Sequence, residues 1–140
     1  MKLEINNIEQ FKNFFDVVYD ASNEIVELKF FIDKMTCAVL DRARTRFFYV
    51  EYESKFFSLY DVEEVSSVCV FIEDIYKLLK LANKTDTLIL EFSNDAMSAQ
   101  LISDGNKRIF EFGLPLDFID SPNFPQASLK ANIDLTTKEL

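Results

Sequence analysis

The chain has 140 residues, which is enough for one domain with a sizeable apolar core. Apolar residues make up 49% of the chain and 15 residues are Phe, whereas His and Trp are absent and Gly occurs only twice. Without His, most general-base, catalytic-triad and zinc chemistry is excluded, and two Gly cannot form a Gly-rich phosphate loop. The formal net charge of −9 disfavours tight binding of nucleic acid by the surface as a whole.

The two cysteines, Cys37 and Cys69, stand in apolar runs. This placement is typical of buried thiols in an intracellular protein rather than of a disulfide or a metal site. Met1–Asn7 lacks the features of a signal peptide, and no apolar run approaches the roughly 20 residues that a membrane span needs. We therefore expect a soluble intracellular protein with no cofactor, no metal and no membrane partner.

The first half of the chain predicts one helix and several strands. Residues 1–5 alternate apolar and charged side chains, as in a strand, and Asn6 and Asn7 suit the N-cap of a following helix. Ile8, Phe11 and Phe15 recur at helical spacing, which predicts a helix over 8–19. Branched and aromatic residues then predict strands over 24–32, 35–40, 46–53 and 56–60, with turns at 33–34 and 54–55.

The second half repeats this order. A strand over 65–70 precedes a helix over 71–82, and strands follow over 87–92, 97–102 and 107–112. Asp104-Gly105 between the last two strands is the strongest hairpin signal in the chain.

The two halves are related as weakly similar copies. Residues 8–18 and 72–82 share an Ile-Glu start and place apolar side chains at the same offsets. The predicted fold class is therefore α+β: a pseudo-symmetric repeat of one strand, one helix and three strands. Because the turns are short and each helix has one apolar stripe, we expect two helices on one face of a mainly antiparallel sheet.

The composition changes after Gly113. All three prolines fall within 114–128, which indicates a linker, whereas 129–135 is patterned as a strand and 136–139 as a capping box. We expect a domain over 1–113, an interdomain connector over 114–128 and the start of a truncated second domain over 129–140.

The order of these elements resembles the DNA sliding clamps of the proliferating cell nuclear antigen (PCNA) type. Asp74–Ala82 looks like that family's second helix, Ala38–Arg44 is similar to its loop after the third strand, and Phe124-Pro125 resembles the end of its interdomain connector. The resemblance implies the N-terminal domain of a DNA-clamp-fold processivity factor, a non-enzymatic ring that encircles duplex DNA. Implied partners are DNA polymerase, the clamp loader and other proteins carrying a short peptide motif, in the cytoplasm of an archaeon or the nucleus of a eukaryote.

The resemblance also implies three sets of site residues. DNA-binding candidates are Lys12, Lys77, Lys80 and Lys84. Partner-binding candidates are Leu40, Arg44, Phe47, Phe118, Ile119 and Phe124. Subunit-interface candidates, on an expected edge strand, are Arg108, Ile109, Phe110, Glu111 and Phe112.

Each set also has a structural interpretation. Lys77, Lys80 and Lys84 lie at i, i+3 and i+7, so they form one stripe that is either a solvated face or a phosphate contact. Three such lysines would give a log–log salt slope of only roughly −3. The first helix departs from the family because it is net acidic, and the candidates at 118, 119 and 124 equally suit packing of the linker onto the sheet.

Alternatives remain open from the sequence. They are a clamp-fold protein of DNA-damage signalling or of a virus, a small α+β enzyme, and an unrelated binding module that uses the Phe-rich face. A full-length chain is expected to form a ring of like subunits. The 140 residues alone are expected to form a monomer or an edge-strand dimer.

Overall fold

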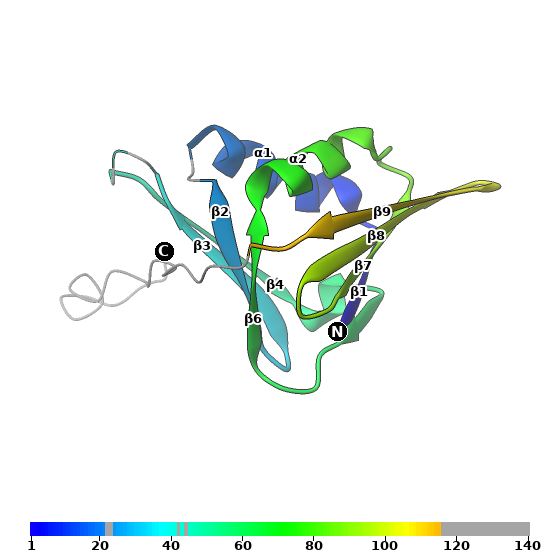
Figure 1. Ribbon diagram of the computed structural model, residues 1–140, viewed down its shortest axis with the longest axis horizontal. Coiled ribbons are helices and arrows are strands. Elements are labelled where there is room, and N and C mark those ends of the chain that lie inside the picture. Colours follow the sequence, from blue (N-terminus) through cyan, green and yellow to red (C-terminus); the bar gives the residue numbers. More distant parts are fainter. Residues whose placement is uncertain (22–23, 42, 44, 116–140) are drawn as a thin grey trace.

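The computed structural model describes residues 1–21, 24–41, 43 and 45–115 (Figure 1). The first copy of the repeat comprises β1 (Lys2–Ile5), α1 (Ile8–Ala21), β2 (Ile25–Phe30), β3 (Lys34–Leu40) and β4 (Phe47–Glu53). A 3₁₀ turn, η1 (Ser54–Phe56), and the short strand β5 (Leu59–Asp61) follow. The second copy comprises β6 (Ser66–Phe71), α2 (Ile72–Leu81), β7 (Thr87–Phe92), β8 (Ala96–Ser103) and β9 (Asn106–Gly113).

The predicted fold class is confirmed, and the strands divide between two antiparallel sheets rather than one. One sheet has the order β5-β1-β7-β8-β9 and the other has the order β4-β3-β2-β6. Each copy thus gives its first strand to the other copy's sheet, because β1 pairs with β7 and β6 pairs with β2. This exchange ties the two copies into one domain.

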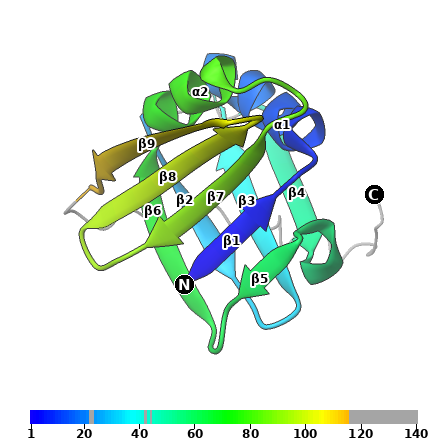
Figure 2. The ribbon, with the colours of Figure 1, turned by 90° about the vertical axis from the view of Figure 1, so that its right-hand side faces the viewer.

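Both helices lie together on one side of the molecule, over the two sheets (Figures 1 and 2). The apolar stripe of α1 is almost fully buried at Ile8, Phe11 and Phe15, and α2 buries Ile75 and Leu79 in the same way. Burying one such side chain contributes about 1.5–3 kcal/mol, so the two stripes hold the helices against the sheets. At the start of α1 the Asn7 side chain accepts a hydrogen bond from the backbone N–H of Gln10, at 3.2 Å, so the expected N-cap is present.

The predicted strand over 56–60 is wrong. Residues 54–56 form η1, and only Leu59–Asp61 is extended and paired, with β1. The cause is aromatic packing: Phe56 stacks on Tyr52 with ring centroids 4.5 Å apart, while Phe57 is buried beside it. Successive strand residues point to opposite faces, so a strand could not direct both rings inward.

The predicted connector over 114–128 and the predicted second-domain start over 129–140 fall outside the described residues, except for Leu114 and Pro115. The backbone N–H of Leu114 donates to the carbonyl oxygen of Asp95 at 2.9 Å, which fixes where the chain leaves β9. Of the two thiols, Cys37 is buried, which raises its pKa to about 12, and Cys69 is half-buried.

Candidate functional site

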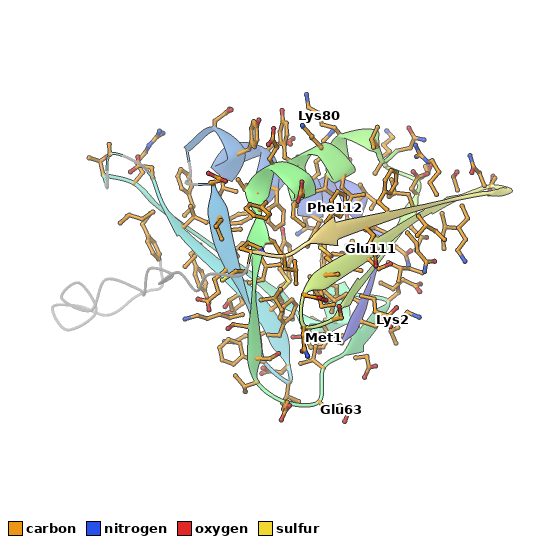
Figure 3. The ribbon with its side chains drawn as sticks, viewed as in Figure 1. Met1, Lys2, Glu63, Lys80, Glu111 and Phe112 are labelled. Carbon is orange, nitrogen blue, oxygen red and sulfur yellow. The ribbon has the colours of Figure 1, made fainter. Side chains whose placement is uncertain are left out.

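Two of the predicted DNA-binding lysines lie on α2, and each has a different partner. Lys77 forms an ion pair with Glu73 one turn earlier, with Nζ 3.2 Å from Oε2. Lys80 instead places its Nζ 5.1 Å from the centroid of the Tyr76 ring. Figure 3 shows Lys80 on the outer side of the helices, away from the sheets.

The other two predicted DNA-binding lysines, Lys84 and Lys12, lie outside α2. The helix α2 ends at Leu81, so Lys84 lies in the exposed turn before β7, and the predicted three-lysine helical stripe is wrong at this position. The turn is closed by Asp86, whose carboxylate accepts the backbone N–H of Asn83 at 3.0 Å. Lys12 is half-buried on α1.

The outer surface of the two helices is not basic. On α1 the charged residues are Lys12 and the acids Glu9, Asp16 and Asp20. On α2 two acids, Glu73 and Asp74, balance the two lysines. A surface of this composition offers little net attraction for phosphates at physiological salt.

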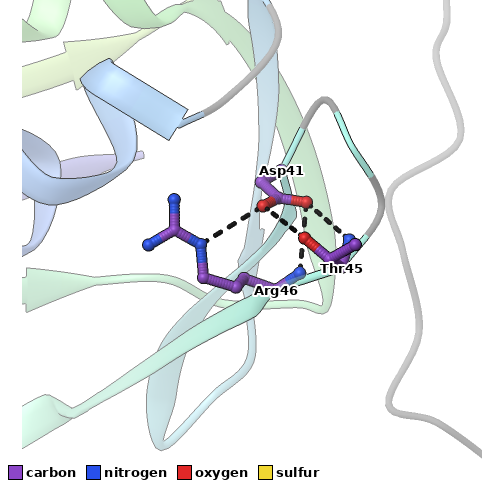
Figure 4. Close-up of polar contacts among 3 residues, drawn as sticks. All are labelled: Asp41, Thr45 and Arg46. Atoms are coloured by element: carbon purple, nitrogen blue, oxygen red, sulfur yellow. Dashed lines mark hydrogen bonds and ion pairs between the residues drawn. The ribbon is translucent and has the colours of Figure 1, made fainter.

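One carboxylate at the end of β3, which sequence reasoning placed in no site, binds the residues that precede β4. Asp41 is only 6% exposed, and its Oδ1 accepts the backbone N–H groups of Thr45 at 2.8 Å and Arg46 at 3.1 Å (Figure 4). The Thr45 hydroxyl and the Arg46 Nε–H donate to the same carboxylate. These bonds, led by that from the Arg46 backbone, lower the pKa of Asp41.

Of the predicted partner-binding residues, the structure describes Leu40 and Phe47. They face each other across the ends of β3 and β4 as paired residues and both are half-buried. The other four candidates, at 44, 118, 119 and 124, lie outside the described residues. Asp41 and Arg46, which adjoin the two described candidates, are also joined through the backbone, because the N–H of Asp41 donates to the Arg46 carbonyl oxygen at 2.9 Å.

The predicted edge strand is confirmed, since β9 is the last strand of its sheet and pairs with β8 (Figure 2). Along β9, Phe110 and Phe112 pack against the core, whereas Ile109 on the other face is 63% exposed. Arg108 connects the strand to the end of α2: its Nη2 donates to the Leu81 carbonyl oxygen at 3.2 Å and lies 3.8 Å from the buried Asp86 carboxylate.

Neither a membrane-spanning helix nor a metal cluster occurs in the described part of the chain. None of its helices is long and apolar enough to cross a membrane. No group of three or more Cys, Asp and Glu side chains within it is placed to hold a metal ion.

Comparisons with known proteins give structural matches alone. No family model matches the sequence, and no curated protein matches it. The PCNA2–PCNA3 complex of Sulfolobus tokodaii matches 89% of this chain with a TM-score of 0.76 and 25% identity, and the match covers 50% of that chain. The PCNA of Thermococcus kodakaraensis matches 89% of this chain with a TM-score of 0.74 and 19% identity, covering 51% of its length.

These neighbours define the fold as the DNA-clamp fold, in which a strand–helix–three-strand unit occurs twice. The chain has the fold of a PCNA-type clamp domain. It spans about half the length of the PCNA chains that it matches.

Proposed function

We propose that this chain supplies one domain of a ring-shaped sliding clamp, a non-enzymatic scaffold that encircles duplex DNA and tethers replication proteins to it. The observation that carries the proposal is the match of 89% of the chain to PCNA structures at TM-scores of 0.74–0.76. One of these structures is a complex of two PCNA chains, which supports assembly with like subunits.

In this proposal the hold on DNA is topological and direct contact is weak. The helices carry Lys77 and Lys80, with Lys12 and Lys84 nearby, but α1 is net acidic. A closed ring retains DNA without tight phosphate contacts, so a protein of net charge −9 can still serve DNA. The acidic α1 also favours a second candidate, a clamp of DNA-damage signalling or of a virus.

The proposed contact between subunits is strand addition at β9. Its backbone edge from Arg108 to Phe112 faces away from β8 and offers the unpaired groups that a further strand needs. We expect the 140-residue chain to be a monomer or an edge-strand dimer in light scattering. A stable ring-like trimer would contradict this expectation.

The proposed contact with replication proteins is at Leu40 and Phe47, together with Arg44, Phe118, Ile119 and Phe124. Half-buried apolar side chains at the end of β3 and the start of β4 suit a short peptide that ends in two aromatic residues. The Asp41 network supports this assignment, because it ties Thr45 and Arg46, next to Phe47, to Asp41, next to Leu40, without the peptide.

The experiment that tests the proposed function is an NMR titration of the labelled protein with a peptide of the form Gln-x-x-Leu-x-x-Phe-Phe. A millimolar complex, only about −4 kcal/mol, is still detected in this way. We expect amide shifts at Leu40 and Phe47 and across the loop between them. A peptide with Ala in place of both Phe is the control, and equal shifts with both peptides, or none with either, would overturn the partner site.

A further inference from the structure

The two helices are joined on their outer side by a pair of stacked tyrosines. Tyr19 on α1 and Tyr76 on α2 lie with ring centroids 3.7 Å apart and planes only 5° from parallel. Both side chains are half-buried, so one edge of the stack reaches the surface of the helix pair. A stack that spans two helices holds each ring more rigidly than a single surface tyrosine would be held.

Lys80 lies on this stack. It follows Tyr76 by one helical turn, and its Nζ is 5.1 Å from the Tyr76 ring centroid, within the range of a cation–π interaction. The Tyr76 side chain raises the pKa of Lys80 as a hydrogen-bond partner, and the negative charge of Asp16 across the helix interface raises it further. The ammonium group therefore stays fully charged at neutral pH.

The ring holds Lys80 without neutralising it. The ion pair between Lys77 and Glu73 cancels the local charge, whereas a ring face attracts an ammonium and leaves its net charge in place. Asp16 acts on Lys80 through its charge, and among the described residues Lys80 forms no ion pair. A free lysine loses rotamer freedom when it binds an anion, at about 0.5–1.5 kcal/mol for each immobilised side chain, and prior ordering reduces that cost.

We propose that Tyr76, braced by Tyr19, is a positioning residue that holds Lys80 in place for contact with a DNA phosphate on the outer side of the helix pair. This inference rests on the proposed function, and it gives a specific role to a residue that the sequence placed in no site. Tyr76 acts through Lys80 and itself touches no DNA in this assignment.

The test begins with substitutions of Tyr76 in the 140-residue protein, which keep its net charge. Affinity for a short blunt-ended DNA duplex at low ionic strength is measured from NMR shifts of the lysine side-chain signals. Tyr76→Leu removes the ring, and we expect it to weaken binding about two- to fivefold, the size of an exposed cation–π contact. Tyr76→Phe keeps the ring but removes the hydroxyl that is a hydrogen-bond partner of Lys80, so it should weaken binding less than Tyr76→Leu does.

A double-mutant cycle then shows whether Tyr76 acts through Lys80. In a Lys80→Gln background the effect of Tyr76→Leu should vanish, whereas in a Lys84→Gln background it should persist. The Hε signals of Lys80 should also show an upfield ring-current shift without DNA, lost in Tyr76→Leu and kept in Tyr76→Phe. Amide spectra confirm that each variant is folded.

The outcomes separate this inference from the proposed function. If duplex DNA shifts the lysine signals but Tyr76→Leu changes nothing, or tightens binding, the positioning role is wrong and the DNA contact stands. Effects of Tyr76→Leu that are equal in both lysine backgrounds would also overturn it. If DNA shifts no lysine signal, the DNA contact fails together with this inference, while the peptide titration still tests partner binding separately.

Discussion

The helices α1 and α2 occupy equivalent places in the repeat, but α1 is net acidic whereas the acids and lysines of α2 balance. In the alignment of residues 8–18 with 72–82, Asp16 stands where α2 has Lys80, and Asn13 stands where α2 has Lys77. The backbone arrangement is the same, since each helix follows one strand and precedes three. The repeat thus fixes where the helices lie and leaves their outer side chains unconstrained.

The buried faces differ as well, though only within the apolar class. The helix α1 buries Phe11 and Phe15, and the aligned positions of α2 are Ile75 and Leu79. Both pairs are almost fully inaccessible to solvent, so either kind of side chain fills the space under its helix. A similar fold therefore depends on the pattern of buried side chains, and it says less about what the outer faces of the helices bind.

The largest expected effect comes from removing buried side chains of the two helices. Phe15→Ala should lower the free energy of unfolding by about 3–5 kcal/mol, because it leaves a cavity where the ring meets Phe11 and Phe14. Leu79→Ala removes fewer atoms and should cost about 2–5 kcal/mol, at the lower end if neighbouring side chains relax. Urea unfolding followed by circular dichroism measures both.

Full loss of the Phe15 ring could unfold the domain, so Phe15→Leu serves as the milder variant. It keeps most of the volume and should cost about 1.5 kcal/mol. If Leu79→Ala lowers the free energy of unfolding clearly more than Phe15→Ala does, the expected difference between the buried faces of α1 and α2 is wrong.

Local signals account for what the sequence predicted well. The strand over 87–92 has the predicted bounds, and the turn at Asp104-Gly105 lies where the hairpin signal placed it. Both depend on residues within a few positions of one another. The false strand over 56–60 and the division into two sheets depend instead on distant partners, namely Tyr52 packing on Phe56 and β1 pairing with β7.

The candidate site shows the same limit. The Asp41 network joins residues four and five positions apart, so the spacing of Asp41, Thr45 and Arg46 could have indicated it. The stack of Tyr19 on Tyr76 joins residues in different copies of the repeat. Its formation depends on how close the helices approach, which no pattern within one helix reveals.

The hairpins that end the two copies give a second contrast, of intermediate size. The β8–β9 turn is short and places Gly105 at φ +66°, with nothing within 4 Å of an added Cβ. Gly105→Ala should therefore cost about 1–2 kcal/mol from backbone strain alone. Gly113→Ala is the matched control, because its surroundings are equally open and its φ is not positive. Thermal unfolding should show a lower Tm for Gly105→Ala, and equal Tm values for the two variants would exclude strain as the cause.

The equivalent β3–β4 hairpin is longer and is held by a side chain, so its stability should depend on pH. The pKa of the Asp41 carboxyl in the folded protein lies below its ordinary value of 3.8, mainly because of the Arg46 backbone N–H. A group with a depressed folded pKa stabilises the protein above its unfolded pKa, and that contribution disappears as the pH falls through the folded pKa.

Asp41→Asn removes this titrating group but keeps one oxygen that can accept the backbone N–H groups. We therefore expect a smaller loss of stability than for the core substitutions or for Gly105→Ala. The variant should be less stable than the original protein at neutral pH, and the difference should shrink as the pH falls below about 3.8. Asp104→Asn, an exposed carboxyl in the β8–β9 hairpin, is the control. Urea unfolding across this pH range measures the difference. If the difference in the free energy of unfolding between the original protein and Asp41→Asn stays constant with pH, the charge of Asp41 does not stabilise the β3–β4 hairpin. Both hairpins would then be stabilised by local backbone geometry.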